Sequence, residues 1–541
     1  MKRKGFLLTL AITIVALVFG PLGWTVSAQN GSPFEEQIED AIVKGLAWLA
    51  AQQNEDGSWG YYPWGCDRVA YTGLAVLKFE TRAIELGLDP MGEEYMYAPQ
   101  VLGGLEYISA NAQDISIGIQ SAGDPDTNGN GIGTYFNQSE CGPWHDIYNT
   151  GIAMMAISAS GHPALYADLL QDAVDYMAWA QSDEFCGLHR GGWRYQPDCD
   201  SDNSNSGYVT LGLGFAEAPP PFGFGLTVPQ FVKDELSIWI DTIQDDVDGD
   251  SDDGGSWYEP YWPWVNILKT GNLIVEMVLA GDTVGTPRLQ DALDYIERHW
   301  QDENNDPGWG YNVYPANYQA MFILKKGLDF ARIPLIDLDG DGTPEHDWFF
   351  EIATAILNQQ DAEGYWSWCD WGDSILCTTW ALLALEPFVP PSPGPIDIKP
   401  GSCPNPLSLT EKGLLPVAIL GLEDFDVTQI DPASVRLFRK AVADPTEVVP
   451  VRWSLEDAGI PYEPFTGRMG AYDCLEYYPD EYGVFDGYLD LSLKFKAQEV
   501  VAALGEVYDG DVVVLQLAAN LKEEFGGTGF VGEDVVWILK K

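Results

Sequence analysis

Hydrophobic and polar residues follow two different periods along the chain, and the period changes near residue 388. Between residues 34 and 387 the apolar positions recur at helical spacing. Amphipathic stretches such as 41–49 are followed there by more apolar stretches such as 70–77. Helices that are apolar on nearly all sides are buried. The pattern therefore predicts amphipathic outer helices around a layer of buried inner helices.

The helical region contains six copies of one short motif, a Gln followed by a Gly-x-aromatic loop. The glycine allows a tight turn, the aromatic ring can cap a helical hairpin, and the Gln can bond backbone at a helix end. We therefore expect the motif to be scaffold, and six hairpins predict a closed toroid in which the sixth hairpin touches the first. The copies are Gln53 with Gly57-Ser58-Trp59, Gln113 with Gly133-Thr134-Tyr135, Gln181 with Gly191-Gly192-Trp193, Gln244 with Gly255-Ser256-Trp257, Gln301 with Pro307-Gly308-Trp309 and Gln360 with Gly364-Tyr365-Trp366.

Beyond the helical region the chain has the texture of a β domain. Short stretches such as 414–420 and 489–495 are rich in β-branched and other apolar residues, and several alternate apolar with polar residues. The predicted fold is mainly α: a six-hairpin α/α toroid at 34–387, a Pro-rich linker at 388–395, and a smaller all-β, sandwich-like domain at 396–541.

The amino terminus resembles a secretory signal peptide. A basic start is followed by an apolar run at 5–19 and by small residues ending at Ala28, so we expect residues 1–28 to be removed on export. An uncleaved membrane anchor is the alternative. No later stretch is long and apolar enough to span a bilayer, so we expect a secreted or cell-surface protein.

Charge and cysteine content agree with an exported protein. The chain has 28 Lys and Arg against 82 Asp and Glu, a net charge of −54, which disfavours nucleic acid and anionic lipid as partners. The excess of acidic residues has two alternative explanations: solubility in a salty medium, or bound cations that neutralise clustered carboxylates. The eight cysteines favour disulfides. The expected pairs are Cys186–Cys199, Cys369–Cys377, Cys403–Cys474 and Cys66–Cys141, with Cys66 bonded to Cys369 or Cys377 as a competing arrangement.

At the first and last motif copies, the chain resembles the prenyltransferase and squalene-oxidase (terpenoid cyclase) repeat superfamily. Residues 44–59 and 359–366 are similar to the Gln-Trp repeat of squalene and oxidosqualene cyclases. The resemblance implies an α/α toroid but no particular chemistry, because that fold also serves protein prenyltransferases, pectate lyases, complement-type thioester domains and cobalamin carriers. The tail, at 396–402 and 415–421, is similar to a module found at the carboxyl termini of exported microbial proteins.

The chemistry of this superfamily fits the sequence poorly. The run Asp250-Ser251-Asp252-Asp253 matches the Asp-x-Asp-Asp of cyclases, but it precedes the Gly-x-Trp and lies in an acidic loop where its carboxylates are hydrated. A second α domain is also missing. No zinc-binding Asp-x-Cys with an inner-helix His is present, and no Cys-Gly-Glu-Gln thioester motif occurs. Cyclisation, prenyl transfer and covalent capture are therefore disfavoured.

Two acidic loops resemble EF-hand calcium loops, in which alternate oxygen ligands point inward. The alternative is a solvated acidic loop. Neither has the acid expected at the twelfth place, where Trp348 and Tyr135 stand, although Asp347 can substitute in the first loop. We expect structural calcium in both loops. The ligands are Asp337, Asp339, Asp341, Thr343 and Glu345 in one loop, and Asp124, Asp126, Asn128 and Asn130 in the other.

Polar residues gather where the inner helices are expected to begin. Alignment on Thr72, Thr150, Thr210, Thr270, Gln319 and Thr378 places Asp67, His145, Asn205, Val265, Tyr314 and Asp373 at equivalent positions. Capping of the inner helices is the simpler role for the acids, and general acid–base chemistry or ligand binding is the alternative. The candidate catalytic residues are Asp67, His145, Asp146 and Asp373. The candidate ligand-binding residues are Arg68, Asn149, Asn205, Asn266, Lys269, Tyr314, Trp144 and Trp371.

Three functions remain open from the sequence, and whether the protein is an enzyme stays open with them. The first is an exported toroid protein with a central cavity for a small-molecule or carbohydrate ligand. The second is a calcium-dependent polysaccharide lyase or hydrolase; a lyase requires a basic residue at the mouth, such as Arg68, Arg190, Arg194 or Lys269. The third is a non-catalytic module that the β domain attaches to a cell surface.

Overall fold

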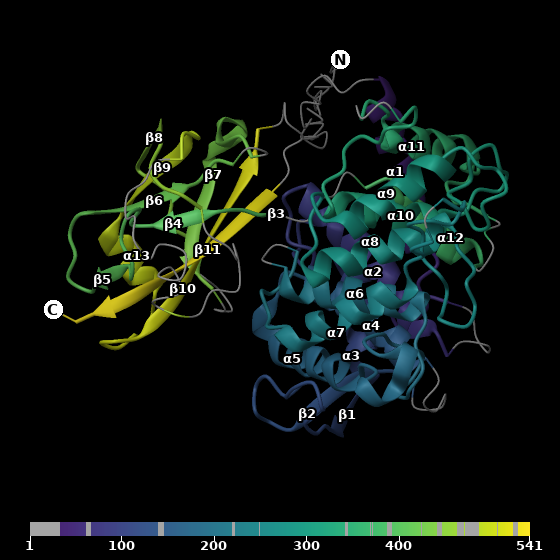
Figure 1. Ribbon diagram of the computed structural model, residues 1–541, viewed down its shortest axis with the longest axis horizontal. Coiled ribbons are helices and arrows are strands. Elements are labelled where there is room, and N and C mark those ends of the chain that lie inside the picture. Colours follow the sequence, from purple (N-terminus) through teal and green to yellow (C-terminus); the bar gives the residue numbers. More distant parts are fainter. Residues whose placement is uncertain are drawn as a thin grey trace, which may run out of the picture.

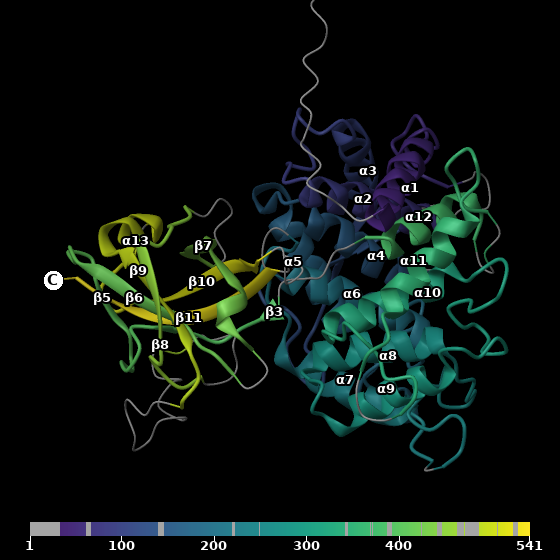
Figure 2. The same cartoon turned by 90° about the horizontal axis from the view of Figure 1, so that it is seen from above.

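The computed structural model describes residues 33–540 apart from 61–65, 139–144, 219–221, 248, 341–343, 368, 370–371, 387–391, 423–424, 441–445, 462–469, 471–485, 506 and 523–528. A helical region and a β region lie side by side as two bodies, as both Figure 1 and Figure 2 show. The predicted signal peptide, the first half of the predicted linker (388–391) and the predicted partners of two cysteines lie outside the described residues.

Twelve helices form the described part of the helical region, and they alternate between an outer and an inner layer (Figure 2). The outer helices are α1 (Pro33–Ala50), α3 (Ala98–Ala110), α5 (Pro163–Ala180), α7 (Gln230–Ile243), α9 (Pro287–His299) and α11 (Trp348–Gln359). The inner helices are α2 (Arg68–Glu85), α4 (Asp146–Ala159), α6 (Asn203–Glu217), α8 (Ile267–Ala280), α10 (Tyr318–Phe330) and α12 (Ser374–Ala384). An antiparallel hairpin of β1 (Ala112–Ser116) and β2 (Ile132–Phe136) precedes α4.

The six hairpins close into a ring. Each inner helix contacts the next one, and α12 contacts both α2 and α1. The Nε2 group of Gln360 donates to the carbonyl oxygen of Ala41 at 2.9 Å. The rings of Phe34 and Phe350 pack with centroids 4.6 Å apart. The sixth hairpin therefore touches the first, as the repeat predicted.

The repeated Gln and Trp residues build this ring. Gln53 Nε2 donates to the carbonyl of Gly57 in its own loop and to that of Gln100 in the next outer helix, both at 2.9 Å. Gln181, Gln244 and Gln360 make the same pair of bonds in their hairpins. The indole of Trp59 is fully buried and donates to Leu49 O. The scaffold role is confirmed for Gln53, Gln181, Gln244 and Gln360 and for Trp59, whereas Gln113 bonds to Asn137 O and Gln301 is exposed.

The motif glycine is required because the loop lies directly on the next outer helix. Gly191 has a φ of 87°, which disfavours any side chain. A Cβ atom at this position would lie 1.9 Å from the carbonyl oxygen of Glu235 in α7. The close approach of loop and helix is therefore possible only with glycine.

The expected alignment of the inner helices is wrong in the third repeat. The hydroxyl of Thr72 accepts from Trp59 N, and Thr150 and Thr378 play the same part in their repeats. In the third repeat the residue that accepts from Trp193 N is Ser206, one helical turn before Thr210. Asn205 is therefore not equivalent to Asp67, although it still lies in the first turn of α6.

Side chains fill the ring between the inner helices. All residues of α4 except Tyr148 are buried, and so are all residues of α8 except Val278 and Ala280. Burial on every face of these helices leaves no space there for the deep central cavity that we expected. The ends of the ring are therefore where the described residues leave side chains accessible.

The β region has two sheets around one hydrophobic core. One sheet has the order β4 (Ile396–Ile398), β6 (Leu414–Ile419), β9 (Asp490–Lys496), β8 (Arg452–Glu456). The other has the order β3 (Ser392–Pro393), β11 (Gly529–Leu539), β10 (Val512–Leu521), β7 (Ile430–Arg439), with β5 (Pro406–Ser408) also paired to β11, and α13 (Ala497–Ala503) follows β9. Except for β3 and β5, which run parallel to β11, the paired strands are antiparallel.

Two of the expected disulfides, Cys186–Cys199 and Cys369–Cys377, are present. The competing bond from Cys66 to Cys369 or Cys377 is thereby excluded. Cys66 and Cys403 are also disulfide-bonded, and their expected partners, Cys141 and Cys474, fall outside the described residues.

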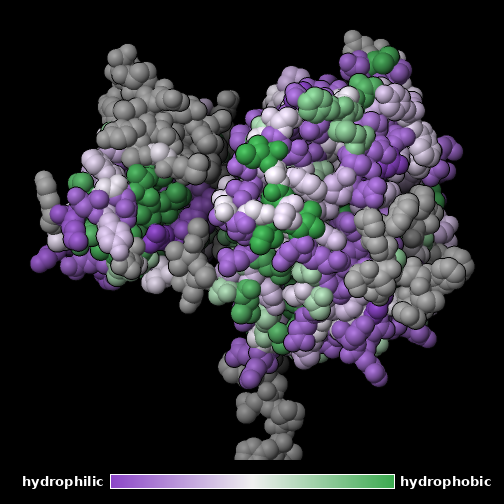
Figure 3. All heavy atoms as spheres, turned by 90° about the horizontal axis from the view of Figure 1, so that it is seen from below, coloured by the Kyte–Doolittle hydropathy of each residue, from purple (hydrophilic) through white to green (hydrophobic). Residues whose placement is uncertain are grey.

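Across the described chain, every helix is too short or too polar to cross a bilayer. Figure 3 shows hydrophobic residues in separate groups on the visible face of the helical region.

Candidate functional site

The amino-terminal ends of the six inner helices meet at one end of the ring, which we call the mouth. Contacts between neighbouring ends define it: Asn149 Nδ2 donates to Cys66 O, Ile147 N to Tyr195 O, and Asn203 N to Tyr258 O. The residues that precede the six helices are Asp67, His145, Asp202, Asn266, Asn317 and Asp373. Four of them, Asp67, His145, Asn266 and Asp373, are candidates identified from the sequence.

Two candidate catalytic residues, His145 and Asp67, form a pair at the mouth. His145 Nδ1 is hydrogen-bonded to Asp67 Oδ1, and this bond raises the pKa of the imidazole. The backbone of His145 is left-handed (φ 65°), which directs the chain into α4. Both side chains are about one third exposed (32% and 39%), so a ligand can reach them. The pair can therefore transfer a proton at the mouth.

Aromatic rings continue from this pair around the mouth. The ring of Tyr195 lies 4.5 Å from that of His145. The hydroxyl groups of Tyr195 and Tyr258 lie close enough to interact. Beyond Tyr258, the indoles of Trp262 and Trp264 stack with centroids 5.6 Å apart. We call His145, Tyr195, Tyr258, Trp262 and Trp264 the aromatic arc.

Lys269 lies beneath the end of the aromatic arc, in the first turn of α8. The residue is 3% exposed. Its Nζ lies 3.4 Å from the centroid of the Trp264 ring and 5.8 Å from that of Tyr258. Burial lowers the pKa of Lys269 to about 7, and Asp306 opposes this shift only in part. Near neutral pH the amine is therefore present in both protonation states.

A second ion-pair group fixes the middle of the arc. Arg194 lies 2.6 Å from Glu259, 3.1 Å from Asp200 and 3.4 Å from the buried Asp202. Asp202 caps α6 by accepting from Asn205 N, and its carboxylate also accepts from the Asn205 amide. Burial raises the pKa of Asp202. The interaction of Asn205 with Asp202 therefore stabilises the first turn of α6.

Several other candidates are structural. Asp373 caps α12 by accepting from Ile375 N and Leu376 N, as the capping alternative predicted. Asp146 is buried and accepts from Asn137, so the protein occupies its carboxylate. Asn266 caps α8 and donates to Asp306 O at 2.8 Å. These residues fix the starts of the inner helices and the loops that lead to them.

Two further candidates have no described contact with the arc. Arg68 pairs with Asp56 at 2.6 Å and lies over the ring of Tyr107, beside a separate cavity of about 410 Å³ on the ring surface. Tyr314 is 81% exposed. Trp144 and Trp371 fall outside the described residues.

The sequence did not identify Tyr195 and Tyr258 as site residues. Each lies one or two positions beyond the aromatic residue of a motif copy, in the segment that leads to the next inner helix. The signal was available: the residues that follow the motif aromatic lead to the start of the inner helix, and the inner helices start at the mouth. Trp262 and Trp264 lie in the same kind of segment.

The acidic loop after α10 brings carboxylates together. Oxygens of Asp337, Asp339 and Glu345 lie within 4.8 Å of one another, and Gly340 turns with a φ of 70°. Asp341 and Thr343 fall outside the described residues. In the other predicted loop Asp126 accepts from Gly129 N, Asn130 N and Gly131 N. Asn128 and Asn130 donate to Asp172, and Asp126 N donates to Asp124. This second loop is folded around its own side chains.

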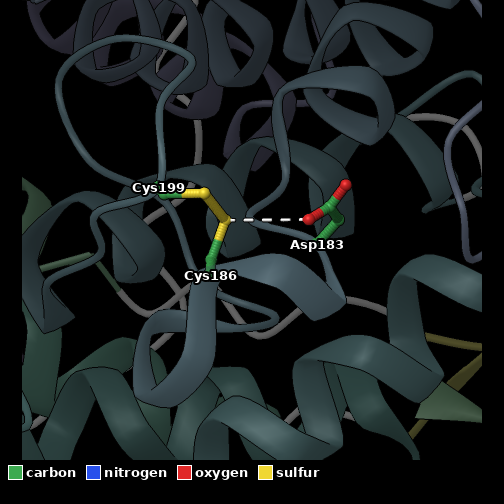
Figure 4. Close-up of side chains that lie close together, drawn as sticks. All are labelled: Asp183, Cys186 and Cys199. Carbon is green, nitrogen blue, oxygen red and sulfur yellow. Dashed lines mark hydrogen bonds between the residues drawn. A yellow bond between two sulfur atoms is a disulfide. The ribbon is translucent and has the colours of Figure 1, made fainter.

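A third group, Asp183 with Cys186 and Cys199, has spacing compatible with a metal site (Figure 4). Asp183 Oδ1 lies 3.8 Å from Cys186 Sγ. The two sulfur atoms are bonded to each other, so neither is a thiolate ligand. Asp183 instead caps a short helical turn by accepting from Phe185 N at 2.9 Å. The group is structural.

Comparison with known proteins gives no family. No protein-family model matches the sequence, and no curated protein matches it. The resemblance to the terpenoid cyclase superfamily therefore stays a prediction.

Solved structures show only remote likeness. A protein from Actinoplanes is 13% identical, with 64% of this chain and 98% of that chain covered and a TM-score of 0.38. An inactive variant of the alpha-1,6-mannanase GH76A of Salegentibacter sp., in complex with alpha-1,6-mannotetrose, is 12% identical, with 65% and 98% covered and a TM-score of 0.38. A GH127 beta-arabinofuranosidase is 9% identical, with 93% and 89% covered and a TM-score of 0.33. Likeness at this level carries no argument about function.

Proposed function

We propose that this protein is exported, binds polysaccharide chains at the mouth of the toroid and acts on them there. The aromatic arc is the observation that supports this most directly. Its rings are partly exposed and follow one another around the mouth, and the polar groups of Arg194, Asp200 and Glu259 lie beside them. Aromatic faces pack well against the apolar faces of sugar rings, and polar groups beside them bind the hydroxyls. A neutral isoprenoid would instead need a dry central cavity, and side chains fill the described ring.

Binding is tested on a panel of neutral and acidic polysaccharides by affinity electrophoresis. Trp262 is 54% exposed at the arc, and Trp453 is 54% exposed on the edge strand β8 of the β region. The Trp262→Ala variant should bind at least about tenfold more weakly, and the matched control Trp453→Ala should bind like the wild type. Loss of binding only in Trp453→Ala would place the ligand on the β region and overturn the proposal.

Analysis of the reaction products distinguishes elimination from hydrolysis. An unsaturated product that absorbs ultraviolet light indicates elimination, and new reducing ends without that absorbance indicate hydrolysis. Hydrolysis requires two carboxyl groups on either side of a glycosidic bond. Among the described residues at the mouth, Asp67 is bonded to His145, Asp373 caps a helix, Asp200 and Glu259 are paired with Arg194, and Asp146 and Asp202 are buried. The described groups thus favour base-assisted elimination, with the His145–Asp67 pair as the base.

We further propose that the loop containing Asp337, Asp339 and Glu345 binds calcium as a structural ion. The oxygens of the three carboxylates converge, and hard oxygen ligands suit calcium. Added calcium should raise the melting temperature, and a chelator should reverse the effect. The Asp339→Asn variant should lose this response, whereas Asp252→Asn, in a different acidic loop, should keep it. An unchanged response in Asp339→Asn would contradict the assignment.

A further inference from the structure

We propose that the mouth recognises the carboxylate of an acidic sugar and that Lys269 is the residue that binds this carboxylate. The inference rests on the proposed polysaccharide function and specifies the substrate class. It starts from a difference between Lys269 and the other buried lysines of the ring.

Lys269 lacks the partner that the other buried lysines have. Lys78 Nζ lies 3.1 Å from Glu386, and Lys326 Nζ lies 3.7 Å from the same carboxylate. Lys325 is paired with Asp329. Among the described residues no hydrogen bond or ion pair reaches Lys269 Nζ, although the residue is as buried as Lys325 (3% and 2% exposed). A buried ammonium without a partner is costly, so it points to a partner that arrives with a ligand.

The surroundings of Lys269 fit an acidic sugar. The ring of Trp264 packs against Nζ at 3.4 Å and is itself part of the arc on which a sugar can stack. Lys269 also lies in the first turn of α8, where the helix dipole favours negative charge. A carboxylate on a stacked sugar would gain both a charge-assisted bond to Nζ and the field of the helix end.

The groups that face Lys269 make the binding depend on pH. Asp306 is the charged group that acts on Lys269, Asn266 caps the same helix, and Tyr258 stays neutral because burial raises its pKa. Burial also sets the pKa of Lys269 at about 7. A carboxylate binds the ammonium form, so the affinity should fall as the pH rises above about 7, and binding near this pH should take up a proton.

The experiment is isothermal titration calorimetry of the whole protein with trigalacturonic acid and with its fully methyl-esterified form, at about pH 6 and about pH 8.5. The two probes have the same sugar chain, and the ester replaces each charged carboxylate by an uncharged methyl ester. The wild type should prefer the acid by about tenfold or more, the expected effect of a charged hydrogen bond. Lys269→Met should lose this preference, and Lys269→Arg should keep it with a weaker dependence on pH, because arginine stays protonated. Lys44→Met, which removes an exposed lysine paired with Asp40, is the control.

Each outcome decides the matter. A preference for the acid that survives in Lys269→Met would overturn the assignment, as would equal binding of acid and ester by the wild type, while the polysaccharide function would stand. If the wild type binds neither probe nor any polysaccharide of the panel, the proposed function fails first. Thermal melting checks that Lys269→Met is folded, so a loss of binding in a folded variant supports the inference.

Discussion

Buried lysines have different surroundings at the mouth and away from it, towards the other end of the inner helices. Away from the mouth, Lys78 of α2 and Lys326 of α10 share the carboxylate of Glu386, which follows the carboxyl-terminal end of α12, and all three side chains are fully buried. At the mouth, Lys269 is buried with no carboxylate of the described residues at ion-pair distance, and the His145–Asp67 pair is partly exposed to solvent. Among the described residues, the buried lysines are paired where the first and last hairpins must meet, and one buried lysine has no ion-pair partner where a ligand can enter.

This contrast indicates that the Glu386 group stabilises the closed ring, whereas the mouth is suited to binding a ligand. Removing a charge from water costs several kcal/mol, and only a close partner offsets the cost. The Glu386 group meets this condition and joins three inner helices, including the two that close the ring. Lys269 does not, which is the kind of local destabilisation that functional sites retain. The comparison can be tested by removing charges at each end.

The largest effect is expected for Glu386→Ala. This change leaves Lys78 and Lys326 without the carboxylate they share, in a place that water does not reach. Breaking a buried pair by removing one partner costs about 3–5 kcal/mol. We expect a loss of this size in the free energy of unfolding, measured by denaturant titration.

The exposed pair of Lys44 and Asp40 is the matched control for Glu386→Ala. Both side chains are more than half exposed (53% and 65%), so Asp40→Ala should change stability by less than about 1 kcal/mol. Equal effects of Glu386→Ala and Asp40→Ala would show that the Glu386 group does not hold the ring closed.

A smaller effect, of opposite sign, is expected for Lys269→Met. Methionine fills a similar volume beneath Trp264 without a charge, so the variant should be more stable than the wild type by about 1–2 kcal/mol at about pH 6. A less stable variant would mean that the contact between Nζ and the Trp264 ring outweighs the cost of burial, and the contrast between the two ends would disappear.

The pH dependence of this difference sharpens the test. The pKa of Lys269 is about 7 in the folded protein because of burial, whereas lysine in the unfolded chain titrates near 10.4. Between these values the unfolded chain holds a proton that the folded protein has released, so a rise in pH stabilises the folded wild type. The advantage of Lys269→Met should therefore shrink between about pH 7 and pH 10. A constant difference across this range would contradict the lowered pKa.

Much of the fold could be predicted because it depends on short-range patterns. The Gln53 and Trp59 signature needs only its own loop and the next helix, so it recurs visibly at each hairpin, and its closure at Gln360 follows from the number of copies. The register of the third repeat could not be read reliably, since α6 carries both Ser206 and Thr210, and either hydroxyl is suitable by residue type. Only the bond from Trp193 N decides between them.

The site was predicted less well because it depends on where loops pass in space. Asp67 and His145 were identified together and do meet, since each precedes an inner helix at an equivalent position. Tyr195 and Tyr258 were missed because their place at the mouth depends on the path of loops whose lengths differ between repeats. The unpaired state of Lys269 also has no signal in the sequence, because a missing partner can be recognised only when the neighbouring helices are in place.

The smallest effect on stability is expected for Asp67→Asn at the mouth. The bond from Asp67 raises the pKa of His145, so this pair stabilises the folded protein at pH values below the ordinary pKa of histidine, about 6.5, and the contribution is lost as the pH rises through the raised pKa. Since both side chains are about one third exposed, water weakens the pair, and the variant should lose less than about 1 kcal/mol. The sharper measurement is an NMR titration of His145, in which Asp67→Asn should return the pKa toward 6.5. If the pKa of His145 stays raised in Asp67→Asn, the charge of Asp146, the other acid acting on this imidazole, is what raises it. The mouth would then depend on a buried carboxylate, as the opposite end of the ring does.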